Sequence, residues 1–273
     1  MSARPLVFCA GTALAAPLAT RARAAAAAGF TSISLWAEDV ARARADGLTD
    51  GDLRALFASL GLTIAELDGV TRWLPGAMAL PFGHAIDEYL ALAGRLGGRS
   101  INVMEIAGQK ADVVEAAEAF AALCAQAAPH GLLVHLEHLP WSGVPDLRSA
   151  WAIVERAGCD NGGLMLDTWH FLRSGGTPDD LRAVPGERIF AVQLADAPAA
   201  PDGHVMDETL HRRRLPGEGD ARIVEILRTL DAIGCTAPLG VEVFSDALAA
   251  RPVDEVARRA AASLHAVLAE AAR

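Results

Sequence analysis

The sequence is poor in lysine, in cysteine and in aromatic residues. Lys110 is the only lysine among 24 basic residues. It follows the fourth predicted strand, where we interpret it as a surface residue, and an imine-forming aldolase is therefore not expected. The four cysteines (Cys9, Cys124, Cys159, Cys235) form no CxxC pair. This usage is typical of reduced core thiols in a cytoplasmic protein.

The sequence also lacks a basic excess and a long apolar run. A net charge of −10 and a pI near 5.2 disfavour a surface that follows nucleic-acid phosphates. No uninterrupted apolar run reaches the ~18 residues of a membrane span. The segment LVFCAGTALAAPLA resembles a secretory signal, but Gly11, Thr12 and Pro17 interrupt it and a strand-like TSISLW follows soon after. We therefore expect it to supply the first strand of a repeating fold.

Eight short apolar runs alternate with longer Ala-, Arg- and Glu-rich stretches. The runs are residues 6–10, 31–36, 62–67, 100–106, 132–137, 163–167, 189–194 and 239–244. Strands that alternate with helices pair in parallel, and eight such units suit a (β/α)8 barrel of about 250 residues. We predict an α/β fold, a single TIM barrel domain over residues 1–273. A doubly wound sheet is the alternative, but CAGTALAAP matches its Gly-rich turn poorly.

The longest irregular stretch is residues 195–220, after the seventh predicted strand. A loop of this length in a compact domain is usually functional, and in a barrel it lies at the catalytic face.

Polar side chains occupy the ends of four successive predicted strands. They are Glu137, Asp167, Gln193 and Glu242. Active sites of such barrels are built at the carboxyl ends of the strands. The residues immediately before these four are apolar, so the alternation of a strand turns the polar side chains inward.

Three inward carboxylates and an amide repel one another unless a cation lies between them. Strand-end acids can also cap the next helix, but four polar groups on four strands favour a metal. We predict one divalent ion bound by Glu137, Asp167, Gln193 and Glu242. The oxygen-rich set suits Mn²⁺ first, and also Mg²⁺ or Co²⁺.

Other candidates for substrate contact lie near the same ends. His170, in DTWH, is a substrate ligand, a group behind the metal ligands or a helix-start residue. The triplet Arg212–Arg214 is a solvated charge run or a clamp for substrate oxygens. Four tryptophans lie just past strand ends and either form an apolar wall of the site or pack loops onto the barrel: Trp36, Trp73, Trp141 and Trp169.

Five segments carry a resemblance to the xylose isomerase-like barrel superfamily. They are LEHLPWSG (136–143), LMLDTWHF (164–171), VQLAD (192–196), RRRLPGEGD (212–220) and VEVFSD (241–246). The superfamily includes ketose 3-epimerases, hydroxypyruvate isomerase and inosose dehydratase, and, more distantly, endonuclease IV. The resemblance implies metal ligands on strands five to eight, here Glu137, Asp167, Gln193 and Glu242. Gln193 departs from the histidine of many relatives, which puts metal affinity and identity in question.

The resemblance also implies the chemistry. Glu137 and Glu242 would be the acid/base pair of a sugar isomerase or epimerase that moves a proton next to a carbonyl. His170 and Arg213 would hold the substrate, with Trp36 and Trp141 beside it. The substrate would be a polyol or keto-sugar. Apart from the resemblance, the cysteine usage predicts a cytoplasmic protein, and a homo-oligomer is one open alternative. A dehydratase of the inosose type and a non-catalytic metabolite-binding barrel are the alternatives. Endonuclease chemistry, which needs many histidine ligands, is disfavoured.

Overall fold

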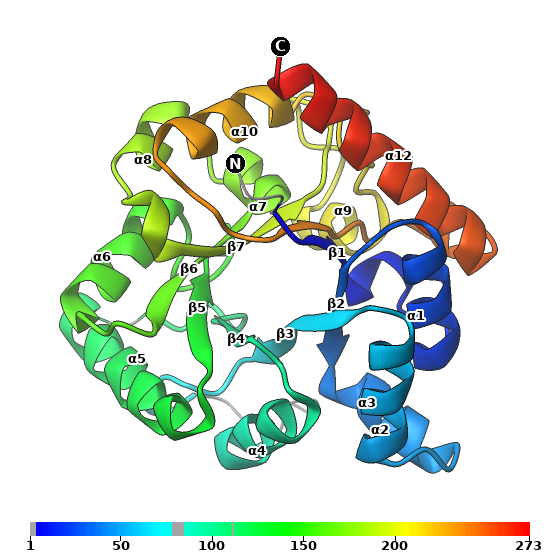
Figure 1. The fold of residues 1–273 in the computed structure, drawn as a ribbon. Coiled ribbons are helices and arrows are strands. Elements are labelled where there is room, and N and C mark those ends of the chain that lie inside the picture. The colour runs from blue at the N-terminus through cyan, green and yellow to red at the C-terminus, as the bar shows by residue number, and fades with distance from the viewer. Residues whose placement is uncertain (1–3, 78–84, 111) are drawn as a thin grey trace.

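The computed structural model describes residues 4–77, 85–110 and 112–273. Eight strands form its centre (Figure 1). Their bounds are β1 (Leu6–Phe8), β2 (Ser32–Trp36), β3 (Thr63–Val70), β4 (Ser100–Met104), β5 (Leu133–Glu137), β6 (Gly162–Asp167), β7 (Ile189–Leu194) and β8 (Leu239–Val241).

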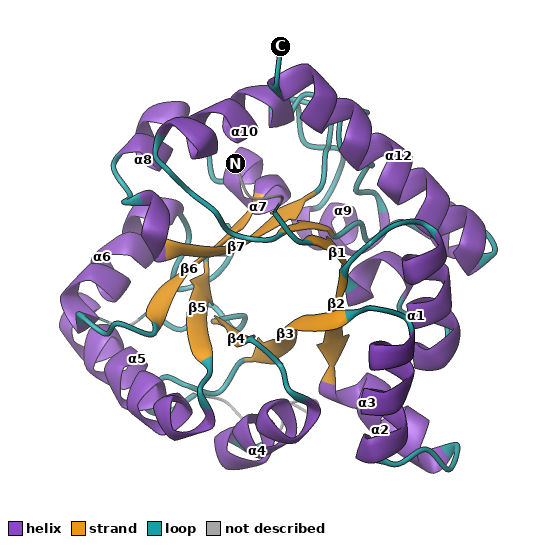
Figure 2. Cartoon of the chain, viewed as in Figure 1, coloured by secondary structure: helices purple, strands orange, loops and turns teal. Residues whose placement is uncertain are grey.

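Helices connect the strands and enclose the barrel from outside (Figure 2). The α-helices are α1 (Leu18–Ala27), α2 (Ala37–Ala45), α3 (Asp50–Ser59), α4 (Ile86–Leu96), α5 (Val113–Ala127), α6 (Leu147–Ala157), α7 (Thr168–Arg173), α8 (Pro178–Arg182), α9 (Val205–His211), α10 (Ile223–Ala232), α11 (Asp246–Ala249) and α12 (Val253–Ala271). The 3-10 helices are η1 (Ala10–Ala13), η2 (Ala128–His130) and η3 (Gly186–Arg188). None of the helices described is long and apolar enough to cross a membrane.

Every strand pairs in parallel with the next, and β1 also pairs with β8, which closes the ring. This closure confirms the predicted (β/α)8 barrel and excludes the doubly wound sheet, whose edges stay open. The segment that resembles a secretory signal contributes β1, which lies between β2 and β8.

The strands alternate as the sequence indicates, with one irregularity. Along β5, Val134 and Leu136 join the layer between barrel and helices, whereas His135 and Glu137 lie outside that apolar cluster. In β3 a bulge interrupts the register: Ile33 pairs with Ile64, but Ser34 pairs with Glu66. A bulge shifts the alternation of side chains by one residue. As a result, Glu66 and Asp68 of β3 lie beside Ser34 and Trp36, the inward positions of β2.

Small residues allow one layer of the barrel interior to pack tightly. Val7, Cys9 and Ala65 form a separate buried cluster inside the ring. A side chain at Gly240 would place its Cβ 2.5 Å from the Cys9 sulfur. The barrel is therefore solid at this level, and room for a ligand lies toward the carboxyl ends of the strands.

Residues 195–220 are more ordered than the sequence indicates. They contain α9, which begins after His204, and the His204 Nδ1 accepts a hydrogen bond from the Met206 amide at 3.2 Å. Asp196 and Arg214 form a two-residue antiparallel bridge that ties the two ends of the segment together. The Asp196 carboxylate accepts from the amides of Gly217 and Ala221. The loop is thus fixed over the barrel mouth.

Candidate active site

Five carboxylates and one amide gather inside the carboxyl end of the barrel. Each is at most 6% exposed. They come from β3, β5, β6, β7 and the residue after β8: Glu66, Asp68, Glu137, Asp167, Gln193 and Glu242. The four residues that the sequence singles out therefore lie together at the carboxyl end of the barrel, and two acids of β3 join them.

Asp167 connects β6 to α7 and holds the start of that helix. Its Oδ1 accepts from the backbone amides of Trp169 at 2.7 Å and His170 at 2.9 Å. This cap makes α7 begin directly after the strand and carries the His170 ring toward Glu137. The His170 Nε2 lies 3.6 Å from Glu137 Oε1.

Glu137, Asp167 and His170 form a cluster that could hold a metal ion. One potential ligand atom of each lies within 4.8 Å of the others. Their hydrogen bonds, however, make His170 the weakest of the three donors. The Arg213 Nη2 lies 3.3 Å from His170 Nε2, and because a guanidinium can only donate, that nitrogen accepts. The ring proton is then on Nδ1, which is buried without a partner among the described residues.

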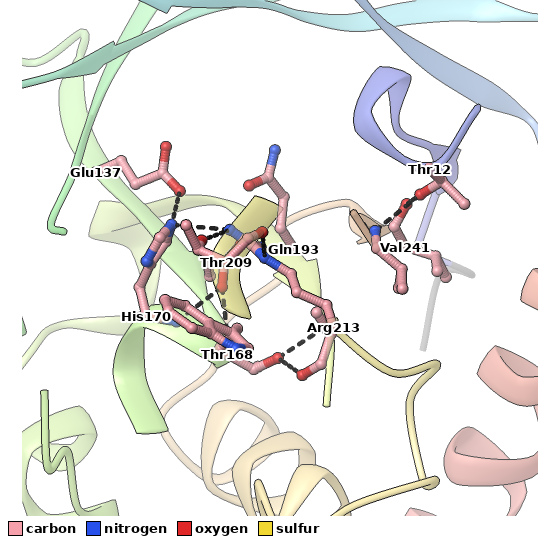
Figure 3. Close-up of polar contacts among 12 residues, drawn as sticks. Thr12, Glu137, Thr168, His170, Gln193, Thr209, Arg213 and Val241 are labelled. Carbon is pink, nitrogen blue, oxygen red and sulfur yellow. Dashed lines mark hydrogen bonds and ion pairs between the residues drawn. The ribbon is translucent and has the colours of Figure 1, made fainter. Parts of the chain in front are cut away.

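Arg213 reaches this cluster from the loop that follows β7. Its Nη1 donates to Asp167 Oδ2 at 2.7 Å, and its Nη2 donates to the Thr209 hydroxyl at 2.8 Å (Figure 3). The guanidinium lies 5.0 Å from the ring centroids of both Trp169 and Phe244. A buried arginine held by two aromatic rings and by hydrogen bonds is fixed in place, so it can present charge without reorganising.

A chain of polar side chains orients Glu137 from the interior. The Asn102 amide donates to Glu137 Oε2 at 2.6 Å, and its oxygen lies 3.1 Å from His135 Nδ1. The other ring nitrogen of His135 lies 3.1 Å from the Ser100 hydroxyl. Sequence reasoning missed Asn102, although its alternation with Ile101 and Val103 in the fourth run is a usable signal.

The side-chain amide of Gln193 has a hydrogen bond at its nitrogen but none at its oxygen. Its Nε2 donates to Glu66 Oε1 at 3.3 Å, whereas its Oε1 is buried and has no partner among the residues described. In Figure 3 its side chain extends into the space between Glu137 and the end of β8. A buried amide oxygen without a donor is costly in an empty interior and is well suited to a cation.

Burial shifts the acid–base behaviour of the cluster. Loss of solvation, with the charge of Asp167, raises the pKa of Glu137 to about 8. Burial and the charge of Asp68 raise the pKa of Glu242 well above its ordinary value. Burial and the charge of Arg213 hold the pKa of His170 well below its ordinary range. Both glutamates therefore hold their protons to higher pH than an exposed glutamate does, and the histidine is neutral.

The donor set of this cavity fits a divalent cation. Five buried carboxylates face one buried arginine, Arg213, so negative charge exceeds positive charge at this end of the barrel. The unpartnered Gln193 oxygen lies among them. Oxygen ligands of this kind suit Mg²⁺, Mn²⁺ or Co²⁺, although carboxylates and a histidine also accept zinc.

The tryptophans divide into two groups. Trp36 and Trp141 are half-buried, and the Trp141 ring centroid lies 5.4 Å from that of His170. Trp73 and Trp169 belong to the core: Trp73 packs edge-on against Phe120 at 6.3 Å, and Trp169 is fully buried. Part of the predicted wall is therefore loop packing. Lys110 is exposed, as predicted.

Comparison with known proteins agrees with this geometry. The chain is 34% identical to a 3-dehydroshikimate dehydratase of Pseudomonas aeruginosa over 88% of its own length and 38% of that protein. It is 34% identical to an inosose isomerase of Halalkalibacterium halodurans over 43% of the chain and 42% of the relative. The chain thus spans less than half of these curated relatives.

A solved structure described as an IOLI protein with a binding zinc atom superimposes with a TM-score of 0.87 at 22% identity, covering 97% of this chain and 98% of that one. At this identity the likeness concerns the fold. The family described as "Xylose isomerase-like TIM barrel" matches residues 22–267. The closed eight-stranded ring, the resemblance carried by the five sequence segments and this match together show that the chain belongs to the xylose isomerase-like TIM barrel family.

Proposed function

We propose that the chain is a divalent-metal-dependent enzyme that removes a proton from the carbon next to a carbonyl and then expels a neighbouring hydroxyl group. It would thus be a dehydratase of a cyclic hydroxy-ketone. The observation that carries the proposal is the pair Glu137 and Glu242, two buried glutamates with raised pKa on strands that flank the Asp167 and Gln193 strands.

The metal would be held by Glu137, Asp167, Gln193 and Glu242. When bound, it would polarise the substrate carbonyl and stabilise the negative charge that develops on its oxygen. The unpartnered Gln193 oxygen supports its inclusion. His170 is a poorer ligand, because its Nε2 already accepts from Arg213.

The chain's own residues account for the proton steps. Asn102 holds Glu137 in a fixed orientation, and the raised pKa makes this glutamate a usable base near neutral pH. Glu242 reaches the same space from the other side and would return a proton. In a dehydration, the base takes the proton from carbon, the C–OH bond breaks, and the departing hydroxide leaves as water after protonation.

Arg213 and His170 would hold the substrate. The buried Nδ1–H of His170 is a donor with no partner among the described residues, and the Arg213 guanidinium is fixed beside it. Together with the half-buried Trp141 they form a wall able to bind substrate oxygens and exclude water.

Dehydration is favoured over isomerisation by the relative that is 34% identical over 88% of the chain and is named a dehydratase of 3-dehydroshikimate. An isomerase or epimerase is the second candidate. It is supported by the position of Glu137 and Glu242, which could reach one carbon from both faces, and by the relative named an inosose isomerase. Both reactions begin with the same proton removal.

The test uses 3-dehydroshikimate and an inosose in D₂O with Mn²⁺, Mg²⁺ or Co²⁺. A dehydratase gives a product lighter by one water in mass spectrometry, whereas an isomerase gives a product of unchanged composition that carries solvent deuterium. Glu137→Gln and Glu242→Gln should each retain metal and lose at least about 10²-fold in turnover. Glu155→Gln, an exposed glutamate on α6, is the control. Normal turnover by both cavity variants would refute their roles.

A further inference from the structure

Asp68 belongs to the same buried acidic cluster as the proposed metal ligands, but it comes from the other half of the ring. It belongs to β3, which is opposite β7 in the closed ring. The residue is only 5% exposed, and neither carboxylate oxygen has a partner of ordinary hydrogen-bond geometry among the described residues, although the side chains of Ser34 and Asn102 lie near enough to lower its pKa. An unsatisfied buried carboxylate is among the most costly groups that a fold can retain.

Electrostatics place Asp68 in the same interior space as the catalytic glutamates. Its charge contributes to the raised pKa of Glu242 and of Glu137. Burial raises the pKa of Asp68 itself to about 6, although Ser34 and Asn102 oppose the rise.

A second group without a partner lies beside Asp68. Trp36 is its cross-strand neighbour on β2, and the Trp36 indole nitrogen is buried without an acceptor among the residues that the structure describes. An indole N–H can only donate and an ionised carboxylate can only accept. A cation would be repelled by the N–H, whereas a hydroxyl group both donates and accepts and thus satisfies the two together.

We propose that Asp68 and Trp36 form a hydroxyl-binding subsite for a polyhydroxylated substrate. The subsite deepens the proposed function and rests on it for the nature of the substrate. Asp68 would accept from one or two ring hydroxyls, and the Trp36 N–H would donate to one of them. Glu66 is not part of it, because its carboxylate accepts from Gln193 and lies 3.7 Å from His135.

The first test measures binding without turnover. Titration calorimetry of metal-loaded protein with shikimate and with myo-inositol, which lack the reactive ketone, reports the subsite alone. Asp68→Ala should weaken binding of at least one of them by about tenfold or more, and Asp68→Asn by less, because asparagine keeps one acceptor. The loss should disappear for a monodeoxy analogue that lacks the hydroxyl in question. Asp160→Asn, at an exposed aspartate, is the matched control.

The second test separates a binding role from a structural one. At a pH above the Asp68 pKa of about 6, Asp68→Asn removes an unpaired buried charge. Its thermal midpoint should rise by about 2 °C or more, whereas loss of a structural contact would lower it.

Unchanged affinity in both Asp68 variants, or no binding of either polyol to the wild type, would overturn the subsite. The proton-transfer proposal would survive either result, because it is judged by turnover and isotope exchange. Conversely, loss of polyol affinity in Asp68→Ala would support the subsite even if neither ketone were turned over.

Discussion

Arg213 donates through Nη1 to Asp167 Oδ2 across 2.7 Å, and both side chains are almost completely buried. The pair joins the loop after β7 to the end of β6. Asp167 Oδ1 meanwhile caps α7, so one carboxylate fixes a strand end, a helix start and a loop. We therefore expect the stability of this region to depend on whether Arg213, a metal ion or neither neutralises the Asp167 carboxylate.

Arg213→Ala should lower the free energy of unfolding of metal-free protein by about 3 kcal/mol, because it leaves a buried carboxylate without its partner. Excess Mn²⁺ should recover part of this loss, since the metal would neutralise Asp167. Denaturation curves recorded in EDTA and in Mn²⁺ measure the loss of unfolding free energy and its recovery by the metal. Arg182→Ala, which breaks the exposed pair with Asp179, should change stability by less than about 0.5 kcal/mol. A deficit unaffected by metal would argue against Asp167 as a ligand.

Gln193→His should bind Mn²⁺ or Co²⁺ at least as tightly as the wild type, because imidazole is the stronger donor for these ions. Asp167→Ala should lose metal and activity together. His170→Gln should keep metal affinity close to that of the wild type, since its Nε2 is already engaged by Arg213. Metal titrations of these three variants and of Gln193→Ala decide the ligand set. If His170→Gln loses the metal while Gln193→Ala retains it, the two ligand assignments must be exchanged.

Metal-free protein should lose stability as the pH rises. The pKa of Glu137 is raised from 4.5 to about 8, so protonated Glu137 stabilises the fold fully below pH 4.5, and this contribution is lost as the pH approaches about 8. Glu137→Gln should flatten this part of the curve. With metal the trend should reverse, because ligands must be deprotonated to bind it. Urea denaturation across the pH range, with EDTA or Mn²⁺, tests both slopes, and identical curves for wild type and variant would contradict the assignment.

Glu208→Gln should weaken the packing of Trp169, whose ring lies against Arg213 and His170. Glu208 Oε1 accepts from the Trp169 indole at 3.1 Å and from Arg173 Nε at 2.9 Å, and Oε2 accepts from the Asp202 amide. Loss of the charge should cost about 1.5–3 kcal/mol of stability. It should also reduce kcat/KM, because Trp169 supports Arg213. Glu225→Gln, in an exposed pair with Arg222, is the control. A kcat/KM equal to that of the wild type would show that the contacts of Glu208 are not needed for activity.

The sequence predicted the barrel well because hydrophobic periodicity and helix stops are local signals. All eight apolar runs contain the observed strands or overlap them. The predicted metal ligands come together at one cavity for the same reason, since alternation along each strand decides which side chains face inward. The last run, predicted over 239–244, is shorter in the structure, where β8 ends at Val241.

Other parts of the site could not be found in this way. Asp68 falls beyond the predicted end of the third run, and regular alternation along β3 would not have turned Glu66 and Asp68 inward, because it is the bulge that does so. The contact of Arg213 with Asp167 spans 46 residues and depends on how the loop after β7 folds back. The helix within that loop depends on the His204 cap, a weak local signal.

The distribution of the site over the ring bears on how this barrel can diversify. The proposed metal ligands come from β5 to β8, whereas Trp36 and Asp68 come from β2 and β3. Substitutions in the first half of the chain can thus alter which substrate is accepted while the reacting groups in the second half stay in place. A recombination experiment that joins residues of the first three strands from one relative to the last five from another would therefore be expected to exchange substrate preference and preserve the reaction.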